Sequence, residues 1–262
     1  MTKNKLKLIA GKTYDEWLEP TKKKSVPIKD QKQYSNQLIA FLDVLGIKSL
    51  IDKHRDGDEH IAIDTIENIW KIVDASTSIM QKSCRIECLH ISDSVVFVCE
   101  PDAIVRLIEL LSTIQMRIIT ECKFLLRGAI TIGDAIVREE ARFIVGPAYI
   151  QAFQLQEDDA IYPRIIVDKS GLREIEKREH LVSDYLQQDL DKEFFVDYIK
   201  VYMKKQSLGK QRIRFILRSE NIFKYLRDSF TKNYQDDKHN ISQKYGWTIQ
   251  YFKESGVLEN GQ

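Results

Sequence analysis

A short apolar stretch, QLIAFLDVLG from Gln37 to Gly46, decides the fold. The run QLIAFL has the length and composition of a buried strand, and it ends at Asp43. A second stretch, RIECLHISDSVVFVC over residues 85–99, contains two strand-like runs that Ser92-Asp93 separates, which predicts a hairpin. Each stretch therefore places an aspartate where a strand ends.

The segments around these strands alternate between helical and extended patterns. Apolar residues recur at helical spacing over 58–81, and Pro101-Asp102 opens a second amphipathic helix that runs to about Glu121. Further elements are predicted as a strand over 124–132 that ends in a turn at Gly133-Asp134, its hairpin partner over 135–138, a helix over 147–155 and a last strand over 164–168. The order β-α-β-β-α-β predicts an α+β, ferredoxin-like antiparallel sheet with two helices on one face. We expect the first strand and the first strand of the hairpin to be neighbours.

Composition limits the class of protein. The chain has 262 residues, of which 43 % are hydrophobic and 30 % charged, as is typical of a globular protein. Its net charge of +1 argues against a dedicated nucleic-acid binder. No run approaches the roughly 20 apolar residues that span a bilayer, so a membrane is not expected as a partner. The four cysteines form no CxxC pair, which favours reduced thiols in the cytoplasm.

Asp43 and Asp93 are the candidate metal ligands. Mg²⁺ and Mn²⁺ prefer oxygen ligands and are commonly bound by one or two carboxylates together with substrate phosphates. Two such ions about 3.5–4 Å apart can assist phosphoryl transfer. Aspartate is also common at strand ends and hairpin tips because its side chain accepts hydrogen bonds from turn N–H groups. These two residues alone leave both explanations open.

The segment FLDVLG over 41–46 resembles the segment of class III nucleotidyl cyclases that carries a metal-binding aspartate. The stretch LHISDSVVF over 89–97 resembles the hairpin that carries the second aspartate of that family. RGAITIG over 127–133 is similar to the following strand, and GPAY over 146–149 to the start of a glycine-led helix. The resemblance covers about residues 36–168 and implies the cyclase catalytic fold.

Several positions depart from the purine cyclases of that family. The base-reading positions hold Leu89 and Phe143, the ribose-orienting asparagine is Ile150, and the transition-state arginine is Gln154. Together with YPRI over 162–165 and KYGW over 244–247, this pattern resembles the pyrimidine cyclases of bacterial Pycsar anti-phage systems. The resemblance implies conversion of UTP or CTP to the 3′,5′-cyclic monophosphate and diphosphate, and it leaves the choice of base open. It also implies a homodimer with sites at the subunit interface, and a separate effector that the product activates.

The resemblance further implies roles for individual residues. Asp43 and Asp93 would hold two Mn²⁺ or Mg²⁺ ions, with the Val44 carbonyl as an additional ligand. The predicted substrate-binding residues are Phe41, Leu45, Gly46, Ile47 and Lys48, the last four of which would bring their backbone close to the β- and γ-phosphates.

Because Gln154 stands in place of the usual arginine, Arg127 and Arg164 are the candidate catalytic cations. A strand arginine that faces solvent or pairs with Glu87 is the alternative for Arg127. A solvated basic face is the alternative for the cluster Lys204, Lys205, Lys210, Arg212 and Arg214. A structural role is expected for His90, because strand alternation places it on the face opposite Asp93.

Three regions follow from these patterns. Residues 1–33 are polar and lysine-rich and predict an N-terminal arm, and residues 34–170 would form the cyclase catalytic domain. Residues 171–262 predict a mostly helical extension, with a long helix over 210–233, packed on the core or on a dimer partner.

Two other functions stay open. One is a catalytically inactive nucleotide-binding regulatory module, because the helix asparagine and arginine of the family are missing. The other is a metal-dependent phosphohydrolase or nucleotidyltransferase on the same fold.

Overall fold

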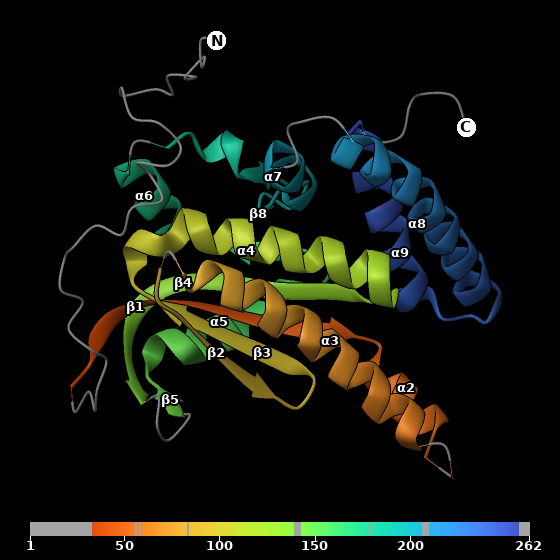
Figure 1. Ribbon diagram of the computed structural model, residues 1–262, viewed down its shortest axis with the longest axis horizontal. Helices are drawn as coiled ribbons and strands as arrows, with labels where there is room; N and C mark the ends of the chain where they lie inside the picture. The colour runs from red at the N-terminus through yellow and green to blue at the C-terminus, as the bar shows by residue number, and fades with distance from the viewer. Residues whose placement is uncertain are drawn as a thin grey trace, which may run out of the picture.

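The computed structural model describes residues 33–55, 57, 59–82, 84–138, 143–178, 180–205 and 210–256, with backbone alone for 210–220. Residues 1–32, almost all of the predicted N-terminal arm, lie outside this range. Within it, no helix has both the length and the apolar character needed to cross a membrane. The fold is α+β, with one sheet that carries helices on both faces (Figure 1).

The predicted order of elements is confirmed from β1 to β4. The strands are β1 (Ser35–Leu45), β2 (Ile86–Ile91), β3 (Ser94–Cys99), β4 (Leu125–Arg138), β5 (Phe143–Val145), β6 (Ile165–Val167), β7 (Leu186–Gln188) and β8 (Phe194–Val196). The α-helices are α2 (Ile47–Lys53), α3 (Glu59–Met80), α4 (Ile104–Arg117), α5 (Pro147–Asp158), α6 (Lys169–Lys177), α7 (Tyr198–Lys205), α8 (Lys210–Gln235) and α9 (His239–Glu254). Short 3₁₀ turns cover Pro101–Ala103 and Val182–Asp184, and a π-helical turn, Ile118–Cys122, continues α4.

The strand β1 lies in the middle of the sheet, whose order is β2-β3-β1-β4-β6-β8-β7. Its neighbours are therefore β3 and β4, and the expectation that it pairs with the first strand of the hairpin is wrong. The second strand of the hairpin pairs with β1 on one side and with β2 on the other, which leaves β2 at the sheet edge. The register still serves the site, because Asp43 lies opposite Ser94, the residue after Asp93.

The two faces of the sheet are covered by different helices. Alternate residues of β1 point to opposite faces, so Leu38 and Leu42 belong to the large core beneath α3 and α4. Ile39 and Phe41 pack with Ala148 of α5 in a smaller cluster on the other face. In Figure 1, α3 and α4 lie along one side of the sheet and α5 lies on the other. Asp43 is two residues after Phe41 in the same strand, so its side chain points to the same face of the sheet, which α5 covers.

The strand β4 is continuous, and the predicted turn at Gly133-Asp134 is wrong. It pairs with β1 from Leu125 to Ala135 without a break, and its hairpin partner is β5 rather than residues 135–138. Close packing accounts for a glycine at this position, because a Cβ at Gly133 would lie 3.3 Å from the Cβ of Ala148. The glycine therefore lets α5 pack closely against the sheet, and it does not form a turn.

The sheet continues past residue 170, so the C-terminal region is not only helical. The strand β6 runs parallel to β4, and β8 and β7 extend the sheet beyond it. The helix α9 is tied to this part of the sheet, since the Tyr251 hydroxyl donates to Asp197 at 2.7 Å and accepts from the Ile199 N–H at 3.1 Å. The helices α8 and α9 pack side by side at one end of the molecule (Figure 1).

Candidate metal and nucleotide site

The two predicted metal ligands lie side by side at one end of the central strands. Asp43 is near the end of β1, and Asp93 is in the tight turn between β2 and β3, where Ser92 adopts a φ of 56°. The Val44 N–H donates to the Asp93 carbonyl at 3.2 Å, which ties the turn directly to β1. The negative charge of Asp93 is close enough to Asp43 to raise its pKa. The hairpin and the central strand therefore bring both carboxylates to one place.

Arg127 on β4 completes this cluster. Its Nε donates to Asp43 Oδ2 at 3.1 Å, and its Nη2 donates to Glu157 Oε1 at 2.8 Å. The guanidinium also donates to the Gln156 carbonyl of α5 at 3.4 Å. The alternative pairing of Arg127 with Glu87 is not seen, because the Arg127 guanidinium is directed to Asp43 and α5, while Glu87 binds Arg85 at 3.2 Å. Register causes the contact, since Asp43 and Arg127 are opposite residues of β1 and β4.

The Asp43 carboxylate lacks full compensation for its burial. Desolvation raises its pKa above the ordinary value, the hydrogen bond and charge of Arg127 lower it, and the charges of Asp93 and Glu157 raise it again. The net direction is upward, which means that the charged form is disfavoured in the absence of a further cation. A divalent cation beside Asp43 would reverse this balance. Two carboxylates at one strand end are the hard oxygen donors that Mg²⁺ and Mn²⁺ take, so the residues present fit such an ion.

The predicted phosphate-binding loop follows directly after Asp43. Gly46 has a φ of 98°, a left-handed conformation that glycine adopts without strain, and it turns the chain from β1 into α2. Gly46 and Lys48 are exposed and Leu45 is half-buried, so the backbone of this turn is accessible. Ile47 is only 2 % exposed, and its side chain anchors the short helix in the core.

Phe41 lies beneath the site rather than in it. Its side chain is 4 % exposed, and its ring centroid is 5.4 Å from that of Phe153 and 6.0 Å from that of Tyr149. These contacts hold α5 against β1. The structure thus gives Phe41 a packing role that positions Glu157 and Arg127, and it does not place the ring where a substrate could touch it.

Arg164 is not part of the cluster. Its side chain is fully buried, and its guanidinium binds the carboxylates of Asp189 and Asp191. Asp189 also accepts from the indole N–H of Trp247 at 2.8 Å, and the Tyr162 ring stacks on that indole at 5.9 Å between centroids. The prediction of Arg164 as a catalytic cation conflicts with this position, because the carboxylates saturate its charge inside the protein.

Two residues of the site were not identified from the sequence. Glu157 lies in α5, far along the chain from Arg127, and nothing local marks it as a partner. Lys244 of α9 lies within electrostatic reach of Asp43, Arg127 and Glu157, and burial together with the positive charge of Arg127 lowers its pKa. Lys244 is the first residue of the KYGW motif, to which the sequence assigned no role. That motif is the sequence feature by which Lys244 could have been identified as part of the site.

The remaining basic residues are engaged elsewhere or lie outside the described side chains. Lys204 pairs with Asp184 at 3.0 Å, and Lys205 pairs with Glu109 at 3.4 Å, so neither joins the cluster. The side chains of Lys210, Arg212 and Arg214 lie outside the described part of the chain.

No protein-family model matches the chain, and no curated protein matches it either. Among solved structures, it is similar to the monomeric guanylyl cyclase domain of the RhoGC fusion protein from the aquatic fungus Blastocladiella emersonii, with 18 % identity and a TM-score of 0.49, over 63 % of this chain and 96 % of that one. A bacterial light-regulated adenylyl cyclase matches with 13 % identity and a TM-score of 0.46, over 66 % of this chain and 55 % of the other. The guanylyl cyclase Cya2 matches with 13 % identity and a TM-score of 0.42, over 62 % and 90 %. Likenesses this distant carry no argument about activity.

Proposed function

We propose that the chain is a divalent-metal-dependent nucleotide cyclase that acts on a pyrimidine nucleoside triphosphate. One observation carries the proposal. The β1–β3 register brings Asp43 and Asp93 together at the end of the central strands, in a place where burial and like charge leave the Asp43 carboxylate short of positive charge. Arg127 binds Asp43 from the side of α5, so this aspartate belongs to a charged cluster and is not an isolated turn residue.

In the proposed site, each residue of the cluster has a defined task. Asp43 and Asp93 would bind two Mn²⁺ or Mg²⁺ ions, and the Val44 carbonyl is a further candidate ligand. When bound, the ions would activate the ribose 3′-hydroxyl and neutralise the leaving diphosphate. The accessible backbone at Leu45 and Gly46 would bind the terminal phosphates, because the left-handed glycine leaves it open to close approach.

Arg127 and Lys244 would supply positive charge from the protein itself. Arg127 is held in place by Asp43 and Glu157, so its guanidinium is oriented before substrate arrives. Lys244 adds a second cation from a distant part of the chain. A triphosphate carries several negative charges, which Lys244 would help to bind, and the preorganised Arg127 would stabilise the charge that develops when the α-phosphate is attacked. We propose that Arg127 replaces the family arginine that is missing at Gln154.

The choice of a pyrimidine rests on the resemblance and on the residues that break the purine pattern. Phe143 on β5 is 47 % exposed and Ile150 on α5 is 54 % exposed. Neither can make the polar contacts with base or ribose that the purine cyclases make at those positions. UTP and CTP are both candidate substrates.

A homodimer is supported by the same exposed surface. Apolar side chains lie open on β5 and the adjoining face of α5, at Phe143, Val145, Ile150 and Phe153. Apolar residues gathered in this way mark protein interfaces. Phe153 lies one turn of α5 before Glu157, so a second copy packed on that end of the surface would border the site. From the resemblance, we further propose that the product activates a separate effector in anti-phage defence.

An activity assay tests the proposal directly. Purified protein is supplied with Mn²⁺ or Mg²⁺ and, separately, with each of the four ribonucleoside triphosphates, and the products are separated by mass. The expected products are a cyclic pyrimidine monophosphate and diphosphate. A linear monophosphate would replace the proposal by a phosphohydrolase, and binding without turnover would replace it by a regulatory module.

A matched pair of variants assigns any activity to the site. Asp93→Asn should reduce the rate more than about 100-fold, because even the outer partners of metal ligands cost 10–100-fold when they are changed. Asp64→Asn, the same change at an exposed aspartate of α3, should leave the rate unaltered. Equal activity in the two variants would overturn the metal assignment.

A further inference from the structure

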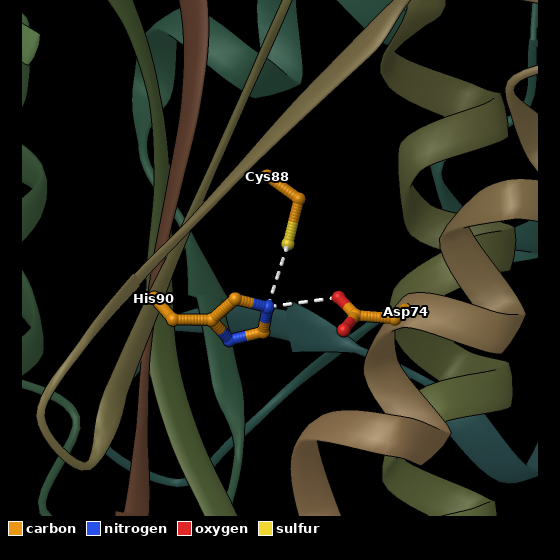
Figure 2. Close-up of side chains that lie close together, drawn as sticks. All are labelled: Asp74, Cys88 and His90. Atoms are coloured by element: carbon orange, nitrogen blue, oxygen red, sulfur yellow. Dashed lines mark hydrogen bonds and ion pairs between the residues drawn. The ribbon is translucent and has the colours of Figure 1, made fainter. Parts of the chain in front are cut away.

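A second group of metal-binding side chains lies between α3 and β2, on the face of the sheet opposite Asp43. Asp74 comes from α3, and Cys88 and His90 come from β2, where their i, i+2 spacing directs both toward the helix. Figure 2 shows the carboxylate and the thiol approaching the same nitrogen of the His90 ring. His90 Nε2 lies 2.8 Å from Asp74 Oδ1 and 4.0 Å from Cys88 Sγ, and the three ligand atoms lie within 4.8 Å of one another.

We propose that Asp74, Cys88 and His90 bind one zinc-class divalent cation, at a site separate from Asp43 and Asp93. Zinc is bound by thiolate sulfur at about 2.3 Å, by imidazole nitrogen at about 2.0–2.1 Å and by carboxylate oxygen at about 2.0–2.2 Å. Tetrahedral ligands at those distances are roughly 3.3–3.8 Å apart. The observed separations of 2.8 Å and 4.0 Å lie on both sides of that range, so the side chains would shift by about 1 Å or less to hold the ion.

The donor set selects the kind of ion. A thiolate and an imidazole favour borderline and soft cations over Mg²⁺, which takes oxygen ligands. The aspartate pair at Asp43 has the opposite preference. The chain would therefore hold two sites that different metals occupy. When the ion binds, the Cys88 S–H bond breaks, the sulfur electron pair forms the metal bond, and the proton leaves to solvent. The hydrogen that His90 Nε2 donates to Asp74 also leaves that nitrogen, so that the Nε2 lone pair binds the ion and the neutral ring keeps its hydrogen on Nδ1.

The cluster is also accessible and partly preorganised. The Asp74 side chain is 61 % exposed and the His90 side chain 28 %, so an ion and a water molecule as fourth ligand can enter. The His90 ring is held by Trp70 of α3, with 4.6 Å between ring centroids. A His–Asp ion pair beside a partly buried Cys88 thiol that is hydrogen-bonded to Thr77 is the competing explanation, and a metal titration separates the two. An ion would cross-link α3 to the strand whose turn carries Asp93.

Cobalt provides the test, because Co²⁺ bound to a thiolate gives a sulfur-to-metal charge-transfer absorption. Metal-free full-length protein is titrated with Co²⁺ alone and then with Zn²⁺. We expect the band to saturate at one equivalent and to disappear when Zn²⁺ displaces Co²⁺. Absence of a saturable band would overturn the proposal, whether or not the protein cyclises nucleotides.

Variants locate the band. Cys88→Ser should abolish it, and Asp74→Asn, on the exposed face of α3, should weaken Co²⁺ binding at least about tenfold. Cys122→Ser and Asp93→Asn are the controls and should retain the wild-type titration. A band that persists in Cys88→Ser, or an unchanged affinity in Asp74→Asn, contradicts the proposal. If Cys88→Ser does not fold, as judged by circular dichroism, the Asp74→Asn titration decides alone.

Discussion

Arg127 on β4 and Arg164, in the bend just before β6, each bind two carboxylates, yet their surroundings differ. Arg127 precedes Gly128 on β4, and Arg164 precedes Ile165 on β6, and these two following residues pair directly. The Arg164 side chain is fully buried and bound by Asp189 and Asp191, whereas the Arg127 side chain is 16 % exposed. We call Arg164 with Asp189 and Asp191 the closed cluster, because its arginine is fully buried. We call Arg127 with Asp43 and Glu157 the open cluster, because its arginine is partly exposed.

The pKa values of the bound carboxylates express this difference. Burial works to raise the pKa of Asp191, but the hydrogen bond from Arg164, with further backbone hydrogen bonds and the charge of Arg164, makes the net shift downward. Burial also raises the pKa of Asp43, and there the charges of Asp93 and Glu157 oppose Arg127, so the net shift is upward. Each cluster holds more carboxylates than cations, but the hydrogen bonds and charge that stabilise ionised Asp191 outweigh its burial, whereas those at Asp43 do not. Asp43 is therefore the carboxylate that a further cation would stabilise.

The largest expected effect comes from breaking the closed cluster. Arg164→Met removes the buried guanidinium and leaves Asp189 without its charge partner beside Trp247. We expect the free energy of unfolding to fall by about 3–5 kcal/mol, measured by urea denaturation. Arg173→Met, at an exposed arginine of α6, should change it by no more than about 0.5 kcal/mol. Similar losses in both variants would mean that the network around Arg164 does not stabilise the fold.

Breaking the open cluster should affect activity more than stability. Arg127→Met removes one side chain that is in contact with Asp43 and Glu157, of which Glu157 is half exposed. We expect a loss of about 1 kcal/mol in the free energy of unfolding. The rate of cyclic nucleotide formation should fall about 100-fold, because a preorganised cation beside the reacting phosphate is lost. If Arg127→Met lost as much stability as Arg164→Met and kept its activity, Arg127 would have a structural role and not a catalytic one.

Lys244 tests whether α9 contributes charge to the open cluster. Lys244→Gln should raise KM for the triphosphate about threefold to tenfold and leave kcat nearly unchanged, as expected for the loss of roughly 1 kcal/mol of ground-state binding. Steady-state rates at varied triphosphate concentration measure this. Lys253→Gln, on the same helix, is the control and should keep the wild-type KM. A change in kcat alone would assign Lys244 a different task.

The smallest effects concern pH and the stability of the metal-free protein. The folded-state pKa of Asp191 is lowered, so its stabilising contribution is complete above the unfolded pKa of about 4 and is lost as the pH falls through the folded value. The folded-state pKa of Asp43 is raised, so its charge destabilises the fold above that pKa, and the penalty disappears as the pH falls through it.

At neutral pH, Asp191→Asn should therefore lower the free energy of unfolding, by less than about 1 kcal/mol because the group is partly exposed. Metal-free Asp43→Asn should be at least as stable as the wild type. Thermal unfolding between pH 4 and pH 7 compares the two variants. A destabilised Asp43→Asn at neutral pH would mean that Arg127 compensates its charge fully.

The sequence indicated the central part of the fold because its signals are local. The apolar run before Asp43, the helical spacing of 58–81 and the Ser92-Asp93 turn each depend on adjacent residues, and β1, α3 and the β2–β3 hairpin confirm them. Gly133-Asp134 misled the prediction because a glycine required for helix packing has the same appearance as a turn glycine. The three-residue strands β7 and β8 are too short for alternation to be recognised.

The site was less accessible to sequence reasoning than the fold. Asp43 and Asp93 stand at strand ends and could be identified. The binding partners of Arg127 and Arg164 could not be predicted, because these partners are distant in the chain. Arg164 meets Asp189 and Asp191 only through the β6–β8 pairing, and Arg127 meets Glu157 only through the packing of α5. Two similar strand arginines therefore received the same prediction and have different environments.

Mn²⁺ binding tests the central claim most directly, since free and bound Mn²⁺ give distinct electron paramagnetic resonance amplitudes. Wild type, Asp43→Asn and Asp191→Asn are each titrated with Mn²⁺ in the presence of UTP and, separately, CTP. We expect saturable binding in the wild type that weakens as the pH falls through the raised pKa of Asp43. Binding should be unchanged in Asp191→Asn, and the affinity should fall by more than about 100-fold in Asp43→Asn. Equal Mn²⁺ affinity in Asp43→Asn and the wild type would contradict the assignment of Asp43 as a metal ligand.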